Sequence, residues 1–129
     1  MSSNHAPFEE LRVWNDAVAL AVTIYRVTDA FPRGEWYVLT SQLRRASVSI
    51  STNIAEGQGR LGRRQFAAFI DIAIGSAREV ESLLCVSQHL GFLDQSQVDA
   101  LRRQTSLVAA SLIQLARWIR ANGRTPKPS

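Results

Sequence analysis

Apolar residues recur at spacings of three and four along most of this chain, and short segments with proline or glycine divide the pattern into four. This spacing places side chains on one face of an α-helix, whereas a half-buried strand requires strict alternation. Ser47, Ser49 and Ser51 do alternate with Val48 and Ile50, but the helical pattern on both sides outweighs this short stretch. The sequence therefore predicts an all-α protein. The predicted helices cover residues 8–31, 35–56, 63–90 and about 95–121.

The segments between these helices contain the residues that end and begin helices. Pro32 should end the first helix, because proline lacks an amide donor and restricts the residue before it. Gly57 and Gly59 should end the second by supplying the left-handed conformation of a C-terminal cap. Asp94 or Ser96 should cap the fourth. Short connections make successive helices neighbours, so we expect an antiparallel up-down four-helix bundle.

Length and composition favour one domain. A chain of 129 residues, 46% of them hydrophobic, forms one core but not two. We expect a single domain over residues 1–129, with an ordered core at about 8–122 and a flexible tail at 124–129. No run approaches the ~20 apolar residues of a membrane span, and residues 1–7 lack the pattern of a secretory signal. With a single cysteine, Cys85, these features indicate a cytoplasmic protein without a membrane partner.

Two patterns concern packing between helices and between subunits. Ala73, Gly75 and Ser76 should mark the closest helix approach. They should face the small residues Ala46, Ser47 and Ser49. The first helix carries a second apolar stripe that makes its apolar arc wider than one bundle seam needs, and Trp118 lies on the fourth helix. We expect these to be buried between subunits of a homo-oligomer. The stripe consists of Val13, Ala17, Leu20, Ile24, Val27 and Phe31.

Basic residues define candidate anion sites. The net charge is +4, and arginine accounts for fourteen of the fifteen basic residues, a bias typical either of phosphate recognition or of genome composition. Arg60, Arg63 and Arg64 surround the predicted N-terminus of the third helix, which makes them an anion site or a solvated loop. Arg102 and Arg103 belong to a second basic patch on the fourth helix. These five arginines are the candidates for binding RNA or another anion.

A set of polar residues on the second and third helices suggests a structural network. If the two helices are antiparallel, residues whose numbers sum to about 120 to 124 lie opposite each other. Arg44 and Arg45 should then form ion pairs with Glu79 and Glu81. These pairs should fix the register of the bundle. The set consists of Arg44, Arg45, Asn53, Glu56, Glu79 and Glu81.

The chemistry of an enzyme is not visible in the sequence. No Ser-His-Asp, Cys-His or HExxH arrangement occurs, and His5 and His89 are too isolated for metal-ligand spacing. We therefore expect no catalytic residue, no metal and no cofactor, and a protein that is not an enzyme.

Several motifs together resemble a bacterial family of four-helix-bundle proteins, many of them encoded in intervening sequences of large-subunit ribosomal RNA genes. The fourth helix matches only by its pattern. The motif residues are Phe8, Leu11, Trp14, Ile24, Tyr25, Thr28, Phe31, Pro32, Gln42, Arg44, Arg45, Ala46, Asn53, Ile54, Ala55, Glu56, Gly57, Gly59, Phe66, Phe69, Ala73, Gly75, Ser76, Glu79, Glu81, Leu90, Gly91 and Leu93.

The resemblance implies a left-handed bundle that assembles into a homopentamer. A related group is similar to the accessory protein of diversity-generating retroelements, a basic pentamer that associates with a reverse transcriptase and its RNA. Two hypotheses follow. The chain is either a homo-oligomeric scaffold that binds itself, or an RNA-binding accessory whose partner is ribosomal RNA, a reverse transcriptase or another nucleoprotein.

Overall fold

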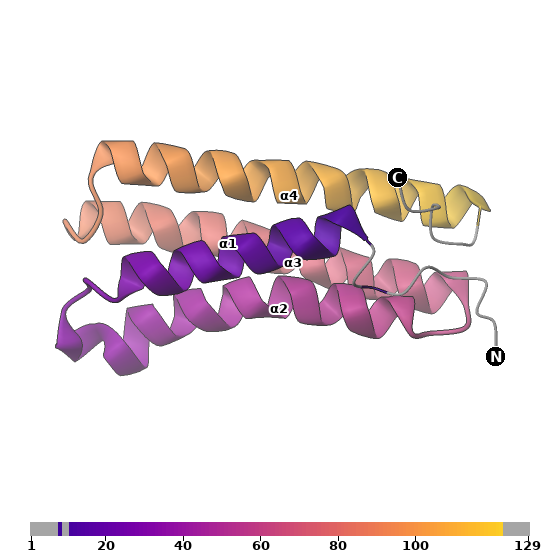
Figure 1. Cartoon of the computed structure of the whole chain (residues 1–129), viewed down its shortest axis with the longest axis horizontal. Coiled ribbons are helices and arrows are strands. Elements are labelled where there is room, and N and C mark those ends of the chain that lie inside the picture. Colours follow the sequence, from indigo (N-terminus) through magenta and orange to yellow (C-terminus); the bar gives the residue numbers. More distant parts are fainter. Residues whose placement is uncertain (1–7, 9–10, 123–129) are drawn as a thin grey trace.

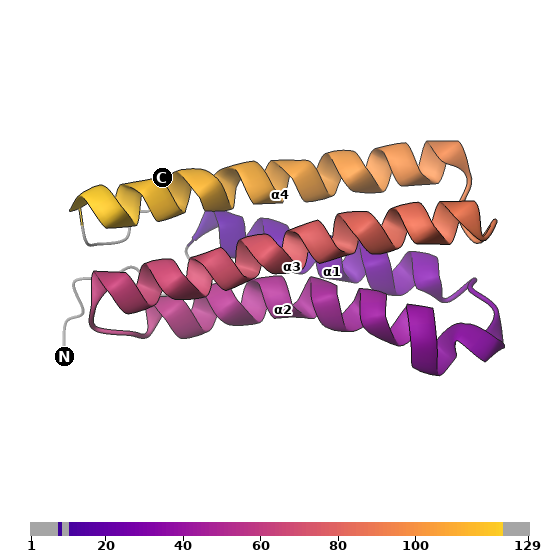
Figure 2. The ribbon, with the colours of Figure 1, turned by 180° about the vertical axis from the view of Figure 1, so that it is seen from behind.

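The computed structural model describes residue 8 and residues 11–122, and within them it forms four α-helices and no strand. Successive helices run in opposite directions, and each lies beside the next (Figure 1). The view from behind shows α3 and α4 side by side along most of the bundle (Figure 2). The predicted all-α four-helix bundle is confirmed, and the predicted tail at 124–129 lies outside the described residues. The helices are α1 (Arg12–Thr28), α2 (Ser41–Gln58), α3 (Arg63–His89) and α4 (Gln95–Asn122), with a 3₁₀ turn η2 (Arg33–Glu35) and a π turn η3 (Trp36–Thr40) between α1 and α2.

One hydrophobic core runs along the bundle axis, and every helix contributes to it. The apolar stripes of α2, α3 and α4 face inward as their period predicts. The largest side chains that are fully buried are Leu20, Ile24, Leu43, Ile50, Ile54, Phe66, Ile70, Leu84, Leu112 and Ile119.

The second apolar stripe of α1 was predicted to lie between subunits, and this prediction is wrong. Ala17, Leu20 and Ile24 are completely buried inside their own bundle, and Trp118 packs against the same core. The reason is geometric, because α1 contacts both α2 and α4 and therefore needs a wide apolar arc. The large apolar side chains that α1 leaves exposed are instead Val22 and Tyr25.

The end of α2 also differs from the prediction. Gly59 caps the helix with φ of −78°, so it does not adopt the left-handed conformation, and α2 continues through Gly57 to Gln58. Gly57 is needed for close packing. A Cβ atom at this position would lie 2.7 Å from Cβ of Phe69 and 3.2 Å from the backbone oxygen of Phe66.

The α3–α4 turn is fixed by backbone and side-chain hydrogen bonds. Gly91 adopts φ of 80° and its amide bonds to Gln88, while the amide of Phe92 bonds to Ser87. These two bonds form the Schellman motif that closes many helices. Asp94 and Gln97 then exchange side-chain and backbone hydrogen bonds of 2.8 and 3.0 Å in a reciprocal cap of α4. Of the two residues predicted to cap α4, Asp94 and Ser96, Asp94 is the one that accepts the hydrogen bond from the helix.

The predicted close approach between α2 and α3 is present at one pair of serines. The hydroxyl oxygens of Ser49 and Ser76 lie 2.9 Å apart, and Ala73 is completely buried. Gly75 does not take part, because it is exposed and no atom lies within 4 Å of the position of a Cβ atom. It faces outward from α3.

Candidate functional site

The connection between α1 and α2 turns large side chains outward. The π turn η3 is held on the core by Leu39 and Thr40, which are buried. The other three residues of the turn, Trp36, Tyr37 and Val38, are 49%, 89% and 55% exposed. Such π turns often occur at functional sites, because they redirect side chains relative to the regular helix.

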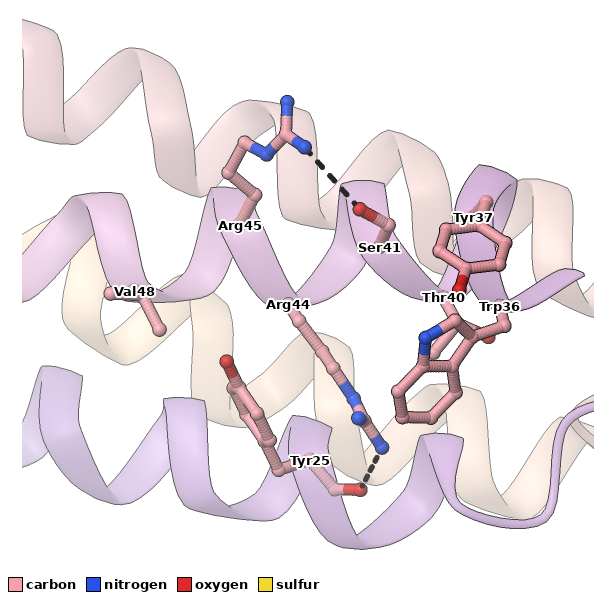
Figure 3. Close-up of a pocket in the computed structure, with 8 residues that line it drawn as sticks. All are labelled: Tyr25, Trp36, Tyr37, Thr40, Ser41, Arg44, Arg45 and Val48. Carbon is pink, nitrogen blue, oxygen red and sulfur yellow. Dashed lines mark hydrogen bonds between the residues drawn. The ribbon is translucent and has the colours of Figure 1, made fainter.

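Arg44 fastens this connection to α1. Its Nε donates a hydrogen bond to the hydroxyl of Thr28 at 2.9 Å, and its Nη2 donates to the carbonyl oxygen of Tyr25 at 3.1 Å and to Asp29 at 2.9 Å. The guanidinium carbon lies 4.6 Å from the centre of the Tyr25 ring and 4.9 Å from that of the Trp36 ring (Figure 3). The guanidinium is ionised, so its hydrogen bonds are charge-assisted. Because the Arg44 side chain is only 13% exposed, these bonds and the two ring contacts are partly shielded from water.

A shallow cavity of about 530 Å³ opens beside Arg44 and is lined by α1, η3 and the start of α2. A second hollow of about 500 Å³ continues from it along the groove between α1 and α2. We call the exposed apolar residues around these hollows the aromatic face. It consists of Val22, Tyr25, Trp36, Tyr37 and Val48.

The predicted ion pairs between α2 and α3 are absent from the described residues. Arg44 points to α1, as described above, and Arg45 donates a bond of 3.4 Å to the hydroxyl of Ser41 (Figure 3). Glu81 pairs instead with Arg78 on its own helix, at 3.0 Å. The prediction was wrong because it considered height along the bundle and not rotation about α2, where Arg44 lies on the side that faces α1.

The remaining members of the predicted polar network divide into bonded and exposed residues. Asn53 donates to the backbone oxygen and the hydroxyl of Ser49, at 2.8 and 3.0 Å, and Ser49 contacts Ser76 on α3. Glu56 and Glu79 are exposed, and neither forms an ion pair with another described residue. Among the described residues, the polar side-chain contact between α2 and α3 is therefore the one between Ser49 and Ser76, which Asn53 supports from within α2.

A basic cluster occupies the opposite end of the bundle. Arg63 and Arg64, together with Arg120 from α4, line a hollow of about 320 Å³. Arg120 forms an ion pair with Asp71, and Arg63 donates a long bond to the backbone oxygen of Arg120. Asp71 therefore neutralises part of this site.

The other candidate arginines are placed differently. The guanidinium of Arg60 lies over the ring of Phe69, 5.0 Å from its centre. Arg102 and Arg103 are exposed near the start of α4. At 1.5 Å per residue they lie about 27 Å from Arg120 along the helix, so they do not join the cluster at the end of α4.

Within the described part of the chain, no group of three or more His, Cys, Asp and Glu residues is placed to hold a metal ion. None of the helices there is sufficiently long and apolar to span a membrane.

The aromatic face was not predicted from the sequence. The chain does contain a signal, because Trp36, Tyr37 and Val38 follow one another and three consecutive residues cannot all point into a helical bundle. The π turn itself, which leaves all three of these side chains exposed, has no comparable signal in the sequence.

Comparison with known proteins identifies the family. The model of the 23S rRNA-intervening sequence protein family matches residues 9–114. The chain belongs to this family. Its members are named for the intervening sequence of 23S rRNA, and the matched region includes the aromatic face and Arg60, Arg63 and Arg64.

A solved structure shows the same fold. It is the crystal structure of a protein of unknown function from the S23 ribosomal protein family of Bacteroides thetaiotaomicron, with a TM-score of 0.73 and 22% sequence identity. The matched region covers 81% of the present chain and 98% of the Bacteroides chain. No curated protein matches the sequence significantly.

Proposed function

We propose that this chain is a non-enzymatic, cytoplasmic scaffold subunit that functions as a homo-oligomer. The observation that carries the proposal is the aromatic face, where Tyr25, Trp36 and Tyr37 are 44%, 49% and 89% exposed beside Val22 and Val48. Scattered apolar residues are normal on a protein surface, whereas a contiguous apolar patch marks an interaction site. Aromatic side chains in such patches contribute strongly to association.

The number of subunits comes from the family resemblance, which implies a pentamer. Light scattering at micromolar concentration tests the proposal directly. We expect a particle of five times the 14.3 kDa mass of one chain. A mass of one chain under these conditions would contradict the proposal, and another multiple would correct the number alone.

The second candidate function is RNA binding, and the hollow lined by Arg63, Arg64 and Arg120 favours it. Five copies of a chain with net charge +4 would carry about +20, which attracts a polyanion from a distance. Because binding of phosphates releases condensed counterions, the affinity should fall steeply with salt.

An RNA titration at two salt concentrations tests this candidate. The variant with Arg60, Arg63 and Arg64 changed to Ala should bind more weakly than the wild type and show a smaller dependence on salt. The matched control changes Arg102 and Arg103 to Ala, which removes exposed positive charge from the distant patch. Equal binding by the wild type and the first variant would exclude the Arg60–Arg64 site, and lack of binding by the wild type would exclude the function.

A further inference from the structure

The outward side of α3 carries a second surface that none of the other described residues covers. Six exposed residues follow one another there at spacings of three and four, the spacing with which packed helices contact each other. The bundle's own core uses the opposite side of α3, through residues such as Ile70 and Ala77. We call this surface the outer face of α3. It consists of Ala68, Ile72, Gly75, Glu79, Ser82 and Val86.

The outer face of α3 and the aromatic face are complementary in size. Three of the six residues of the outer face are small, Ala68, Gly75 and Ser82, and at Gly75 no atom lies within 4 Å of the position of a Cβ atom. Small residues at a helix surface allow another element to approach the backbone closely. The aromatic face projects Tyr37, its most exposed side chain, which the alignment of Ser49 with Ser76 brings level with the end of the outer face near Val86.

The two faces are also complementary in charge. Arg26 and Arg45 line the hollows of the aromatic face, and neither forms an ion pair within the described residues. Glu79 is the charged member of the outer face of α3, and it too has no such pair there. Contact between two aromatic faces would bring arginines together, which is unfavourable.

Height along the bundle places these charges level with each other. The bond between Ser49 and Ser76 shows that these two residues lie at the same height on α2 and α3. Because the helices are antiparallel, Arg45, four residues before Ser49, lies at the height of residue 80, four residues after Ser76. Rotation about an axis parallel to the bundle keeps every residue at its height. In a ring of that symmetry, Arg45 of one copy comes level with Glu79 of the next.

We infer that a second copy of this chain covers the aromatic face with the outer face of its α3, bringing Arg45 of one copy to Glu79 of the other. The contact is head-to-tail, and it forms a closed ring when successive rotations between neighbouring copies complete a full turn, as the proposed homo-oligomer requires. The inference rests on the proposed homo-oligomer and names the two surfaces that form it.

Light scattering of two variants tests the inference. Tyr37→Asp should disrupt the aromatic face and Gly75→Arg the outer face of α3, so each variant should have the 14.3 kDa mass of one chain. The matched control is Leu107→Asp, because Leu107 on α4 is 67% exposed and belongs to neither face. Its mass should equal that of the wild type, and circular dichroism should show that all three variants remain helical.

Mixing the two monomeric variants distinguishes a head-to-tail contact from a symmetric one. Each variant retains one intact face, so the mixture should form a dimer of one Tyr37→Asp and one Gly75→Arg chain. If the aromatic faces met each other, Gly75→Arg alone would still assemble, and that result would overturn the inference.

A charge exchange provides the second test. Glu79→Arg and Arg45→Glu should each weaken assembly, and the double variant should restore it.

The outcomes separate the inference from the proposed function. If the wild type assembles and none of these substitutions changes its mass, the interface lies elsewhere and the proposed homo-oligomer remains intact. A monomeric wild type would contradict both. Loss of RNA binding by Tyr37→Asp without loss of assembly would assign the aromatic face to nucleic acid instead.

Discussion

Two neighbouring arginines show how much local direction matters at the scale of single residues. Arg44 is almost buried, contacts two aromatic rings and donates hydrogen bonds to two groups of α1 and to Asp29, which follows it. Arg45 is exposed and donates a single long bond within its own helix. Residue type and position in the chain are nearly the same, so the difference arises from the turn of the helix between them.

We predict that Arg44→Ala lowers the free energy of unfolding by about 1.5 to 3 kcal/mol, the range for hydrogen bonds to charged groups. Arg44→Lys should recover only part of the loss, because an ammonium group cannot make the same planar set of bonds. Urea denaturation monitored by circular dichroism measures both. Arg102→Ala, at an exposed position of α4, is the control and should change the value by less than about 0.5 kcal/mol. Similar midpoints for Arg44→Ala and this control would show that Arg44 does not fasten α1 to α2.

Gly57 gives a second prediction at this scale. Ala is a better helix former than Gly by about 1 kcal/mol. At Gly57, however, the added Cβ would lie 2.7 Å from that of Phe69, and forced overpacking costs about 1 to 3 kcal/mol. We therefore expect Gly57→Ala to destabilise the protein in thermal unfolding. Gly59→Ala, where the nearest atom lies at an ordinary 3.6 Å, should be neutral or stabilising. The prediction fails if both variants melt at or above the wild-type temperature.

At the scale of elements, the helix hairpins are fixed in two different ways. The α3–α4 connection is determined locally, through the Schellman bonds of Gly91 and the reciprocal cap of Asp94 and Gln97. The contact between α2 and α3 depends instead on small side chains such as Ser49 and Ser76 that bring the backbones together. The first is therefore sensitive to polar substitutions and the second to an increase in volume.

The local cap can be tested by Asp94→Ala, which removes the oxygen that accepts the amide of Gln97. Loss of such a cap typically costs about 1 kcal/mol. Asp99→Ala removes a carboxylate from the same helix that bonds only to an exposed glutamine side chain, so chemical denaturation should show a smaller effect. An equal effect of the two substitutions would indicate a general charge effect on α4.

The packing of α3 can be tested by Ala73→Leu. Ala73 is completely buried, so three additional carbon atoms should overpack the core and cost about 1 to 3 kcal/mol. Ala110→Leu introduces the same change at an exposed position of α4 and serves as the control. An unchanged urea midpoint for Ala73→Leu would show that this part of the core has room for the larger side chain.

At the scale of the whole molecule, the sequence predicts the bundle well, because four separate stripes of period 3.6 allow few other arrangements. It predicts less well which stripe of α1 lies inside, since both stripes are apolar and only the positions of α2 and α4 decide between them. The aromatic face depends on a π turn whose geometry no residue of the turn specifies by itself. Of the Arg44 contacts, the one with Trp36 depends on that turn, whereas the hydrogen bonds to α1 and Asp29 depend on the rotation of α2, so neither kind was predicted.

The connection between α1 and α2, which carries Trp36 and Tyr37, and the cluster of Arg63, Arg64 and Arg120 lie at opposite ends of the bundle, separated by the length of α2. A ring of such subunits around an axis along the helices would therefore have two chemically unlike rims. One rim would gather every copy of the arginine cluster, and the other would gather the connections between α1 and α2. A strand of nucleic acid or a protein that recognises the arginine rim would then attach in a single orientation, and the opposite rim would remain open to a different partner. The particle would have a defined top and bottom, which turns a symmetric assembly into a directional adaptor.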